Sequence, residues 1–323
     1  MCVTLALACG ASNTPSSDGD DDTPAALSPC GDAVPTCPVD RCAGGRCALV
    51  RLAAATGEVF AVDETHVYWA SAREIQRMPK CGGPVEVVAL SQADFTEVRA
   101  YGDAVYVRID AFPQKLFRLP KALAASEELA VDATVTVGTT LSLAVAGEHA
   151  YVAHPIGLIA FPLAGGPGVV LRQSGVASTL GSDDRRAYFY TSYPDAGFFA
   201  LDGLTESVFF RPDEASSLLV SASASDGEAL YVAYAPYQPV TLYRVSPTEG
   251  ATPLAELDER PSSVQVDDRC VYVASEDGEL RGLVRLPKAG GALETVAAAG
   301  GSFAIDAGAV YFTSGGNLYR LPK

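Results

Sequence analysis

The sequence is poor in the residues that most often carry enzyme chemistry, and in positive charge. Among its 323 residues are three histidines, two asparagines, two methionines and one tryptophan. Lysine and arginine number 23 against 39 aspartates and glutamates, which gives a formal net charge of −16. This balance argues against binding of nucleic acid, whose phosphates need cationic side chains, and against a basic patch for anionic lipid. We expect the acidic surface to confer solubility.

Several motifs are missing as well. No run of about 18 apolar residues is present, so no membrane-spanning helix is expected. There is no GxSxG elbow, no GxGxxG after a strand and no P-loop. His66 and His149 fall in different repeats of the chain and provide no shared metal site. We therefore expect no cofactor and no metal and identify no catalytic residue, although the carboxylates leave a carboxylate-only site open.

The first nine residues, MCVTLALAC, form a short apolar run with small residues before Cys9. They resemble the end of a bacterial lipoprotein signal, in which Cys9 becomes the lipid-bearing first residue of the mature chain. A complete signal needs about 15–30 residues, so we interpret residues 1–9 as a remnant and expect the true start upstream. The alternative is an incidental apolar start of a cytosolic protein. Residues 10–29 are rich in Ser, Thr, Pro, Gly and Asp, which predicts a disordered linker.

Four closely spaced cysteines follow the linker: Cys30, Cys37, Cys42 and Cys47. Their intervals of seven, five and five residues differ from the CxxC pairs of a tetrahedral zinc site. In an exported chain they indicate two disulfides among the four, in one of three pairings. We therefore predict a small disulfide-bonded segment at residues 30–46. Cys81 and Cys270 are either free or part of the same network.

A repeat of about 40 residues runs through the rest of the chain. Its mark is a tyrosine within a short apolar run, at spacings of 38, 45, 37, 43, 41 and 39 residues: Tyr68, Tyr106, Tyr151, Tyr188, Tyr231, Tyr272 and Tyr311. Five of these tyrosines have an aspartate five positions earlier: Asp63, Asp183, Asp226, Asp267 and Asp306. Aspartate carboxylates bond readily to backbone N–H groups in turns. Each pair therefore predicts a hairpin with the aspartate at its turn and the tyrosine in its second strand.

A third strand carries the pattern arginine, hydrophobic residue, Pro-Lys, as in RMPK at 77–80 and RLPK at 320–323. Proline ends this strand because it cannot donate to a central ladder, and a fourth apolar segment follows. Four short strands per repeat are typical of a β-propeller blade. We predict an all-β, seven-bladed propeller over residues 47–323. The chain stops after a third strand, so residues 47–53 are expected to supply the missing fourth strand and remove an exposed sheet edge.

The segment VYWAS at 67–71, followed by Ile75 and Arg77, resembles the YWTD repeat of LDL-receptor-type propellers. Tyr68 and Trp69 match the aromatic pair of that motif. Only this repeat has tryptophan, and most repeats replace the final aspartate of the motif with Ala, Arg or Thr. Together with the lipoprotein-like start and the four-cysteine segment, the pattern resembles bacterial envelope lipoproteins whose activity is not established. The resemblance implies the propeller fold, an envelope location and a protein-binding surface.

Binding residues are expected in irregular loops on the rigid scaffold. We interpret the repeated tyrosines and aspartates as structural, with the tyrosine hydroxyls bonded to neighbouring backbone. In repeats two to five, the loop between the second and third strands contains proline beside one ring: Phe112, His154, Tyr193 or Tyr237. Proline stiffens such loops, and aromatic rings on them can anchor a partner. The alternative is that these rings cover the ends of the blades.

These features predict a non-catalytic, exported, lipid-anchored propeller at the periplasmic or outer-membrane face of the envelope. We expect a monomer that acts as a binding scaffold for an envelope protein or polysaccharide. The alternative is an exported enzyme of hydrolase or lyase type, or a small-ligand receptor, that uses the central funnel. Three or more carboxylates at the funnel mouth would favour that alternative. A cytosolic scaffold is the third interpretation, and the fold by itself does not choose, because propellers host all three.

Overall fold

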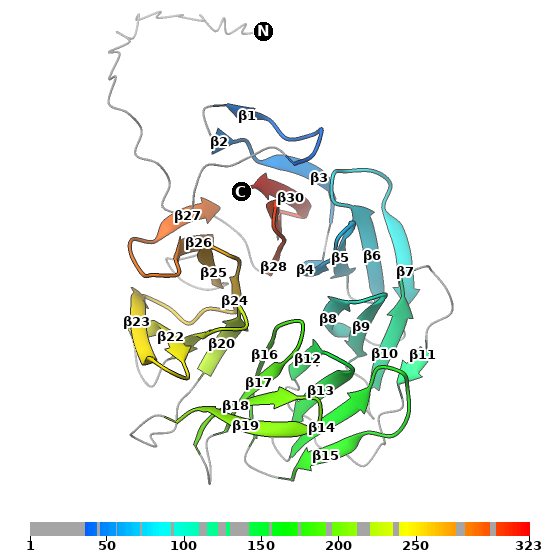
Figure 1. Cartoon of the computed structure of the whole chain (residues 1–323). Helices are drawn as coiled ribbons and strands as arrows, with labels where there is room; N and C mark the ends of the chain where they lie inside the picture. The colour runs from blue at the N-terminus through cyan, green and yellow to red at the C-terminus, as the bar shows by residue number, and fades with distance from the viewer. Residues whose placement is uncertain are drawn as a thin grey trace, which may run out of the picture.

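The computed structural model describes residues 36–43, 46–55, 57–71, 73–91, 94–109, 115–121, 127–129, 142–154, 157–173, 176–191, 196–211, 220–234, 239–275, 282–297 and 302–323. These residues form seven four-stranded antiparallel sheets and one short hairpin. Each sheet is one blade of a propeller, and the blades stand around a common centre (Figure 1). The predicted all-β, seven-bladed fold is therefore confirmed. No helix in the described part is long and apolar enough to cross a membrane.

In blades one to six the strands follow one another in sequence from the centre outward, and in blade seven β3 takes the outermost place. Blades one to three comprise β4 (Glu58–Val62), β5 (His66–Ser71), β6 (Glu74–Pro79) and β7 (Glu86–Leu90); β8 (Phe95–Tyr101), β9 (Ala104–Ile109), β10 (Lys115–Pro120) and β11 (Glu127–Leu129); β12 (Ser142–Ala146), β13 (His149–His154), β14 (Gly157–Pro162) and β15 (Val169–Arg172). Blades four to six comprise β16 (Val176–Ser182), β17 (Ala187–Thr191), β18 (Gly197–Asp202) and β19 (Thr205–Phe210); β20 (Val220–Ser225), β21 (Leu230–Tyr234), β22 (Val240–Ser246) and β23 (Gly250–Leu257); β24 (Ser263–Val266), β25 (Cys270–Ser275), β26 (Gly282–Pro287) and β27 (Glu294–Ala297). Blade seven comprises β28 (Phe303–Ile305), β29 (Ala309–Ser314), β30 (Asn317–Pro322) and β3 (Val50–Ala54).

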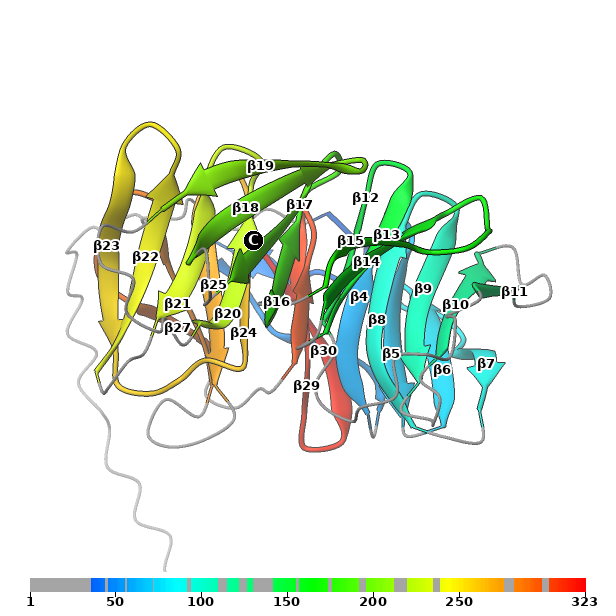
Figure 2. The ribbon, with the colours of Figure 1, turned by 90° about the horizontal axis from the view of Figure 1, so that it is seen from below.

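The second strand of a blade lies inside the core, because neighbouring blades cover both of its faces. In β5, residues 67–70 are all buried, which explains the continuous apolar run around each repeated tyrosine. The apolar clusters join adjacent blades: Trp69 and Met78 of blade one pack with Tyr311 and Leu318 of blade seven. The innermost strands contact one another around the whole ring, including β28 with β4, so the ring is closed. Seen from the side, the blades form one layer of strands (Figure 2).

The ring is closed by a strand from the N-terminal part of the chain. Strand β3 pairs antiparallel with β30, with Val50 opposite Arg320 and Ala54 opposite Asn317. The predicted closure is confirmed, and its bounds shift from 47–53 to 50–54. Cys47 lies instead in a separate hairpin, in which β2 (Arg46–Cys47) pairs with β1 (Cys42–Ala43). The pairing of β3 with β30 covers the edge of β30, which would otherwise present free backbone groups to other chains.

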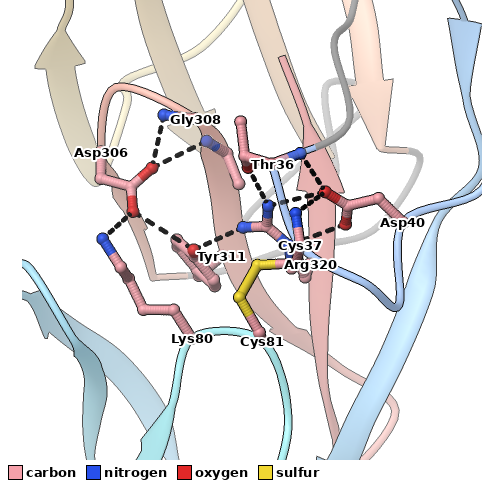
Figure 3. The surroundings of a disulfide bond; sticks show 10 residues. Thr36, Cys37, Asp40, Lys80, Cys81, Asp306, Gly308, Tyr311 and Arg320 are labelled. Carbon is pink, nitrogen blue, oxygen red and sulfur yellow. Dashed lines mark hydrogen bonds and ion pairs between the residues drawn. A yellow bond between two sulfur atoms is a disulfide. The ribbon is translucent and has the colours of Figure 1, made fainter.

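The segment before the hairpin is bound to the propeller by a disulfide and a buried ion pair. Cys37 is bonded to Cys81, which follows β6, with 5.2 Å between their Cα atoms. The carboxylate of Asp40 accepts hydrogen bonds from Nε and Nη2 of Arg320 at 2.9 Å each. The side chain of Asp40 is 0% exposed and that of Arg320 is 1% exposed. Thr36 accepts a further bond from Arg320 (Figure 3). Residues 36–40 therefore lie against blades one and seven.

The disulfide pattern corrects the sequence prediction. One bond, Cys42–Cys47, does lie within the four-cysteine segment. The other described bond leaves that segment for Cys81, because ring closure brings residues 44 positions apart together. Cys270 is disulfide-bonded too, while Cys9 and Cys30 lie outside the described residues. Bonds of this kind persist in oxidising compartments, which indicates a location outside the cytoplasm.

Candidate functional site

Each repeat aspartate is the centre of a compact hydrogen-bond network. In blade one, Oδ1 of Asp63 accepts the backbone N–H groups of Thr65 and His66 at 2.7 Å each, and Oδ2 accepts the hydroxyl of Tyr68 at 2.8 Å. The tyrosine bond recurs in four further blades, at 2.7 to 3.2 Å: Tyr188–Asp183, Tyr231–Asp226, Tyr272–Asp267 and Tyr311–Asp306. The turn role predicted for the aspartates is confirmed. We predicted that the tyrosine hydroxyls bond to neighbouring backbone. In these five blades that prediction is wrong, because the hydroxyl donates to the aspartate carboxylate.

The lysine of Pro-Lys completes this network across the blade boundary. Lys121 of blade two reaches Asp63 of blade one at 2.9 Å, and Lys80 of blade one reaches Asp306 of blade seven at 2.6 Å (Figure 3). Two further pairs of the same kind lie between blades five, six and seven: Lys288–Asp226 and Lys323–Asp267. We call these four ion pairs the interblade clasps. Each clasp joins one blade to the preceding one, which explains why the Pro-Lys pattern recurs. The lysine of the Pro-Lys pattern is visible in the sequence, but its partner lies in another blade, about 60 positions away or near the other end of the chain, so the pattern does not reveal its role.

Blades two and three lack an aspartate five positions before the repeat tyrosine. In blade two, Asp103 lies only three positions before Tyr106, and both of its carboxylate oxygens accept Arg118 at 2.9 Å. Blade three has no aspartate at the turn, and Tyr151 donates instead to the carbonyl of Gly203 in blade four at 2.8 Å. Here the predicted bond from a tyrosine to neighbouring backbone is found. Blade five ends its third strand at Ser246 without a lysine, so no clasp reaches Asp183 from it within the described residues.

The third-strand arginines lie beside the repeat tyrosines, and several of them donate to a nearby carboxylate. In the ladder, Arg77 is opposite Tyr68, and Arg320 is opposite Tyr311, with its guanidinium 5.4 Å from the ring centre. Arg77 donates to Glu86 of the fourth strand at 2.8 Å, and Arg285 does the same with Glu294 at 2.9 Å. In blade seven the fourth-strand position opposite Arg320 is Val50, and Asp40 supplies the missing carboxylate.

The clasps lower the pKa values of their aspartates. Burial by itself raises the pKa of Asp267, but Lys323 and the N–H groups of Cys270 and Arg269 outweigh it and hold this pKa below its usual value. The same opposition lowers the pKa values of three further aspartates: Asp63, Asp226 and Asp306. These carboxylates stay ionised and are poor proton carriers at neutral pH.

We expect acid to destabilise the ring through these aspartates. Their pKa values are lower in the folded than in the unfolded chain, where aspartate titrates near 3.9. Below about pH 4 the unfolded chain therefore binds more protons, and the clasps' contribution to the free energy of unfolding, full at neutral pH, is lost as pH falls through the folded values. Urea titrations followed by the fluorescence of Trp69 between pH 7 and 3 measure this.

Asp267→Asn is the matched variant for that titration. It is expected to be less stable than the wild type at pH 7 and to lose less stability on acidification, because one titrating group is gone. Equal loss in the two proteins would contradict the role assigned to the clasp at Asp267.

A polar cavity of about 440 Å³ occupies the centre of the ring. All seven innermost strands contribute to its lining. Seven serines supply most of the polar atoms: Ser142, Ser182, Ser221, Ser223, Ser225, Ser262 and Ser263. Among the described residues of the lining, Arg99 is the charged side chain, and no carboxylate, imidazole or aromatic ring is present. The described residues also contain no group of three or more His, Cys, Asp or Glu side chains placed to hold a metal ion.

Arg99 belongs to a charge cluster at the boundary of blades two and three. Glu97 accepts its Nη2 at 2.7 Å, lies 3.6 Å from Nε of Arg108, and accepts the N–H of Leu143 in the next blade at 2.9 Å. Burial raises the pKa of Glu97, against the opposing effect of both guanidiniums. Arg99 was not predicted as a site residue, although it occupies a strand position that is alanine or glycine in five of the other six repeats and Gln265 in the sixth.

The four predicted partner-binding residues are not placed by the structure. Phe112, Tyr193 and Tyr237 lie outside the described residues. His154 ends β13, and its side chain is not described. The described strands fix the topology around them: these segments join second to third strands, at the opposite end of the blades from the aspartate turns and clasps. We call these two ends of the ring the loop face and the clasp face.

Comparisons with known proteins identify the fold. No protein-family model and no curated protein matches the chain. Among solved structures, virginiamycin B lyase from Staphylococcus aureus is 15% identical with a TM-score of 0.62, covering 85% of this chain and 99% of that one. YCF48 bound to a D1 peptide is 12% identical (TM-score 0.58; 85% and 96% covered), and BamB from Moraxella catarrhalis is 15% identical (0.53; 82% and 84%). The protein is a seven-bladed β-propeller. The matches extend to various propellers without selecting a family, so the YWTD resemblance stays a resemblance of repeats.

Proposed function

We propose that this protein is a non-catalytic, exported propeller, lipid-anchored at Cys9, that acts as a binding scaffold at the cell envelope. The observation that carries the proposal is that the ionisable and hydroxyl side chains of the repeat bond to one another. The ionised aspartates, the tyrosine hydroxyls and the clasp lysines are bonded to one another between blades. They stiffen the ring instead of facing a substrate, as expected of a platform that presents loops.

The anchoring geometry supports one orientation of this scaffold. Asp40 and Thr36 bind Arg320 beside the Asp306 turn, and Cys37 is bonded to Cys81 just after the clasp residue Lys80 (Figure 3). The chain from Cys9 therefore joins the propeller on its clasp face. A lipid anchor at Cys9 then holds the clasp face toward the membrane and leaves the loop face free for a partner.

Crosslinking in intact cells, followed by fractionation and mass spectrometry, tests the proposal. We expect an envelope protein or polysaccharide to be recovered with the wild type. Replacing Phe112, Tyr193 and Tyr237 with alanine is expected to reduce recovery about tenfold or more, because aromatic anchors carry much of a binding energy. Cys9→Ala is expected to release the protein from the membrane fraction.

A clasp-face triple variant, Glu64→Ala with Asp268→Ala and Arg269→Ala, is the matched control, because these turn residues are exposed. It is expected to recover the partner at the wild-type level. Loss with this control but not with the loop variant would contradict the loop-face site. Absence of any macromolecular partner, or full membrane retention of Cys9→Ala, would contradict the scaffold or its anchor.

A further inference from the structure

The central cavity has the size of a small-molecule site. Its volume of about 440 Å³ lies within the range of about 300–1,000 Å³ that ligand pockets occupy. The interblade clasps lie at one end of it, since Val62, Ser225, Val266 and Ile305 of the lining each precede a clasp aspartate. Its walls are therefore rigid, and a ligand that enters meets a site that is already formed.

The charge on the cavity wall selects for anions. Glu97 is shared between Arg99 and Arg108, so this cluster of three carries one positive charge in excess. Arg99 is the member that reaches the cavity, with 40% of its side chain exposed, whereas Glu97 and Arg108 are each 11% exposed. Its guanidinium donates to Glu97 and to the carbonyl of Val98. An arginine has five donors, which leaves capacity for a carboxylate.

Serine hydroxyl groups of other blades line the same cavity as this arginine. Ser182, Ser223 and Ser263 lie on β16, β20 and β24 and line the cavity. No hydrogen bond joins their hydroxyls to another residue in the described part of the chain. Each hydroxyl both donates and accepts, so these three groups match a ligand that carries hydroxyls of its own.

We propose that the central cavity binds a small hydroxylated monocarboxylic acid, such as a sugar acid. Its carboxylate pairs with Arg99, and its hydroxyls bond to the serines of blades four to six. A single negative charge matches the single excess charge of the Glu97–Arg99–Arg108 cluster, whereas a phosphate dianion would leave a charge uncompensated inside an acidic protein. Without an aromatic ring in the described lining, a neutral sugar has no stacking surface. The residues of this site lie on or directly beside the innermost strands, whereas the partner-binding loops join second to third strands.

Titration calorimetry of the full-length protein with D-galacturonate tests the site. Galactose, its neutral counterpart, and galactose 6-phosphate serve as comparison ligands. We expect saturable binding of galacturonate and at least tenfold weaker binding of the other two. Arg99→Met should weaken galacturonate binding at least tenfold. Arg73→Met is the matched control, because Arg73 is exposed in the turn between β5 and β6, is paired with Asp94 and does not line the cavity, so this variant should bind like the wild type.

A second variant separates ligand contact from folding. Ser223→Phe places a ring in the cavity without touching the charge cluster, and it should abolish binding while Trp69 fluorescence stays native. Equal affinity for galactose and galacturonate, tighter binding of the phosphate, unchanged affinity in Arg99→Met, or no galacturonate binding would each overturn the proposal. The loop variant of the scaffold experiment should bind galacturonate normally, so failure of either proposal leaves the other standing.

Discussion

Replacing residues 50–54 with a Gly-Ser segment of equal length is expected to lower the free energy of unfolding by about 3–5 kcal/mol, counting about 1 kcal/mol for each lost ladder position. Strand β3 pairs with β30 at four positions, and its Leu52 and Ala53 pack against the cluster that joins blades one and seven. Because this strand completes blade seven and continues in the chain into blade one, the loss acts on the whole propeller. Urea denaturation measures it.

Trp69 is a suitable probe for that experiment, since it is the only tryptophan and is fully buried in the same cluster. The same Gly-Ser replacement at residues 10–14, within the predicted linker, is the control and should leave stability unchanged. The variant at 50–54 should also form oligomers at high concentration, because the edge of β30 becomes free to pair. A monomer that unfolds at the wild-type urea concentration would contradict closure by β3.

Asp40→Ala is expected to destabilise the protein by about 3–5 kcal/mol, the usual effect of leaving a buried charge without its partner. The partner is the guanidinium of Arg320, which is 1% exposed and cannot turn to water. Thr36 and the hydroxyl of Tyr311 remain near Arg320, but neither carries a charge. Differential scanning calorimetry and urea denaturation at pH 7 measure the change.

Glu86→Ala is the matched control for Asp40→Ala. Glu86 holds Arg77 at the corresponding place in blade one, but its side chain is 43% exposed. Water reaches this pair from the Glu86 side, and Arg77 keeps its bond to the carbonyl of Lys121, so this variant should lose clearly less stability than Asp40→Ala. Similar losses in the two variants would show that burial of the Asp40–Arg320 pair does not set its contribution.

Much of the fold follows from the sequence, because the same local pattern recurs in successive blades. The spacing of tyrosines such as Tyr68 and Tyr311 predicts the number of blades, and a turn aspartate such as Asp63 predicts each inner hairpin. These are local features: Asp63 bonds to residues two, three and five positions away. The closing strand is also predictable, because the last repeat lacks its fourth strand and the first residues resemble it.

The contacts between blades were not predictable from the same pattern. Lys121 forms an ion pair with Asp63 across a blade boundary, and Arg320 donates to Asp40, which lies 280 positions away in the sequence. The partner of Cys37 is Cys81, although five cysteines lie nearer in the sequence. The binding role predicted for Phe112, Tyr193 and Tyr237 stays a prediction.

The sequence by itself determined the class of fold, the seven blades and their closure, because local turn chemistry and a regular period suffice for these. Only the tertiary structure decided which cysteines and charges meet, and that Arg99 and seven serines share one cavity. The reason is physical: each blade brings a single inner strand to the centre. Lining residues from neighbouring blades are therefore about 40 positions apart, and no local signal in the sequence joins them.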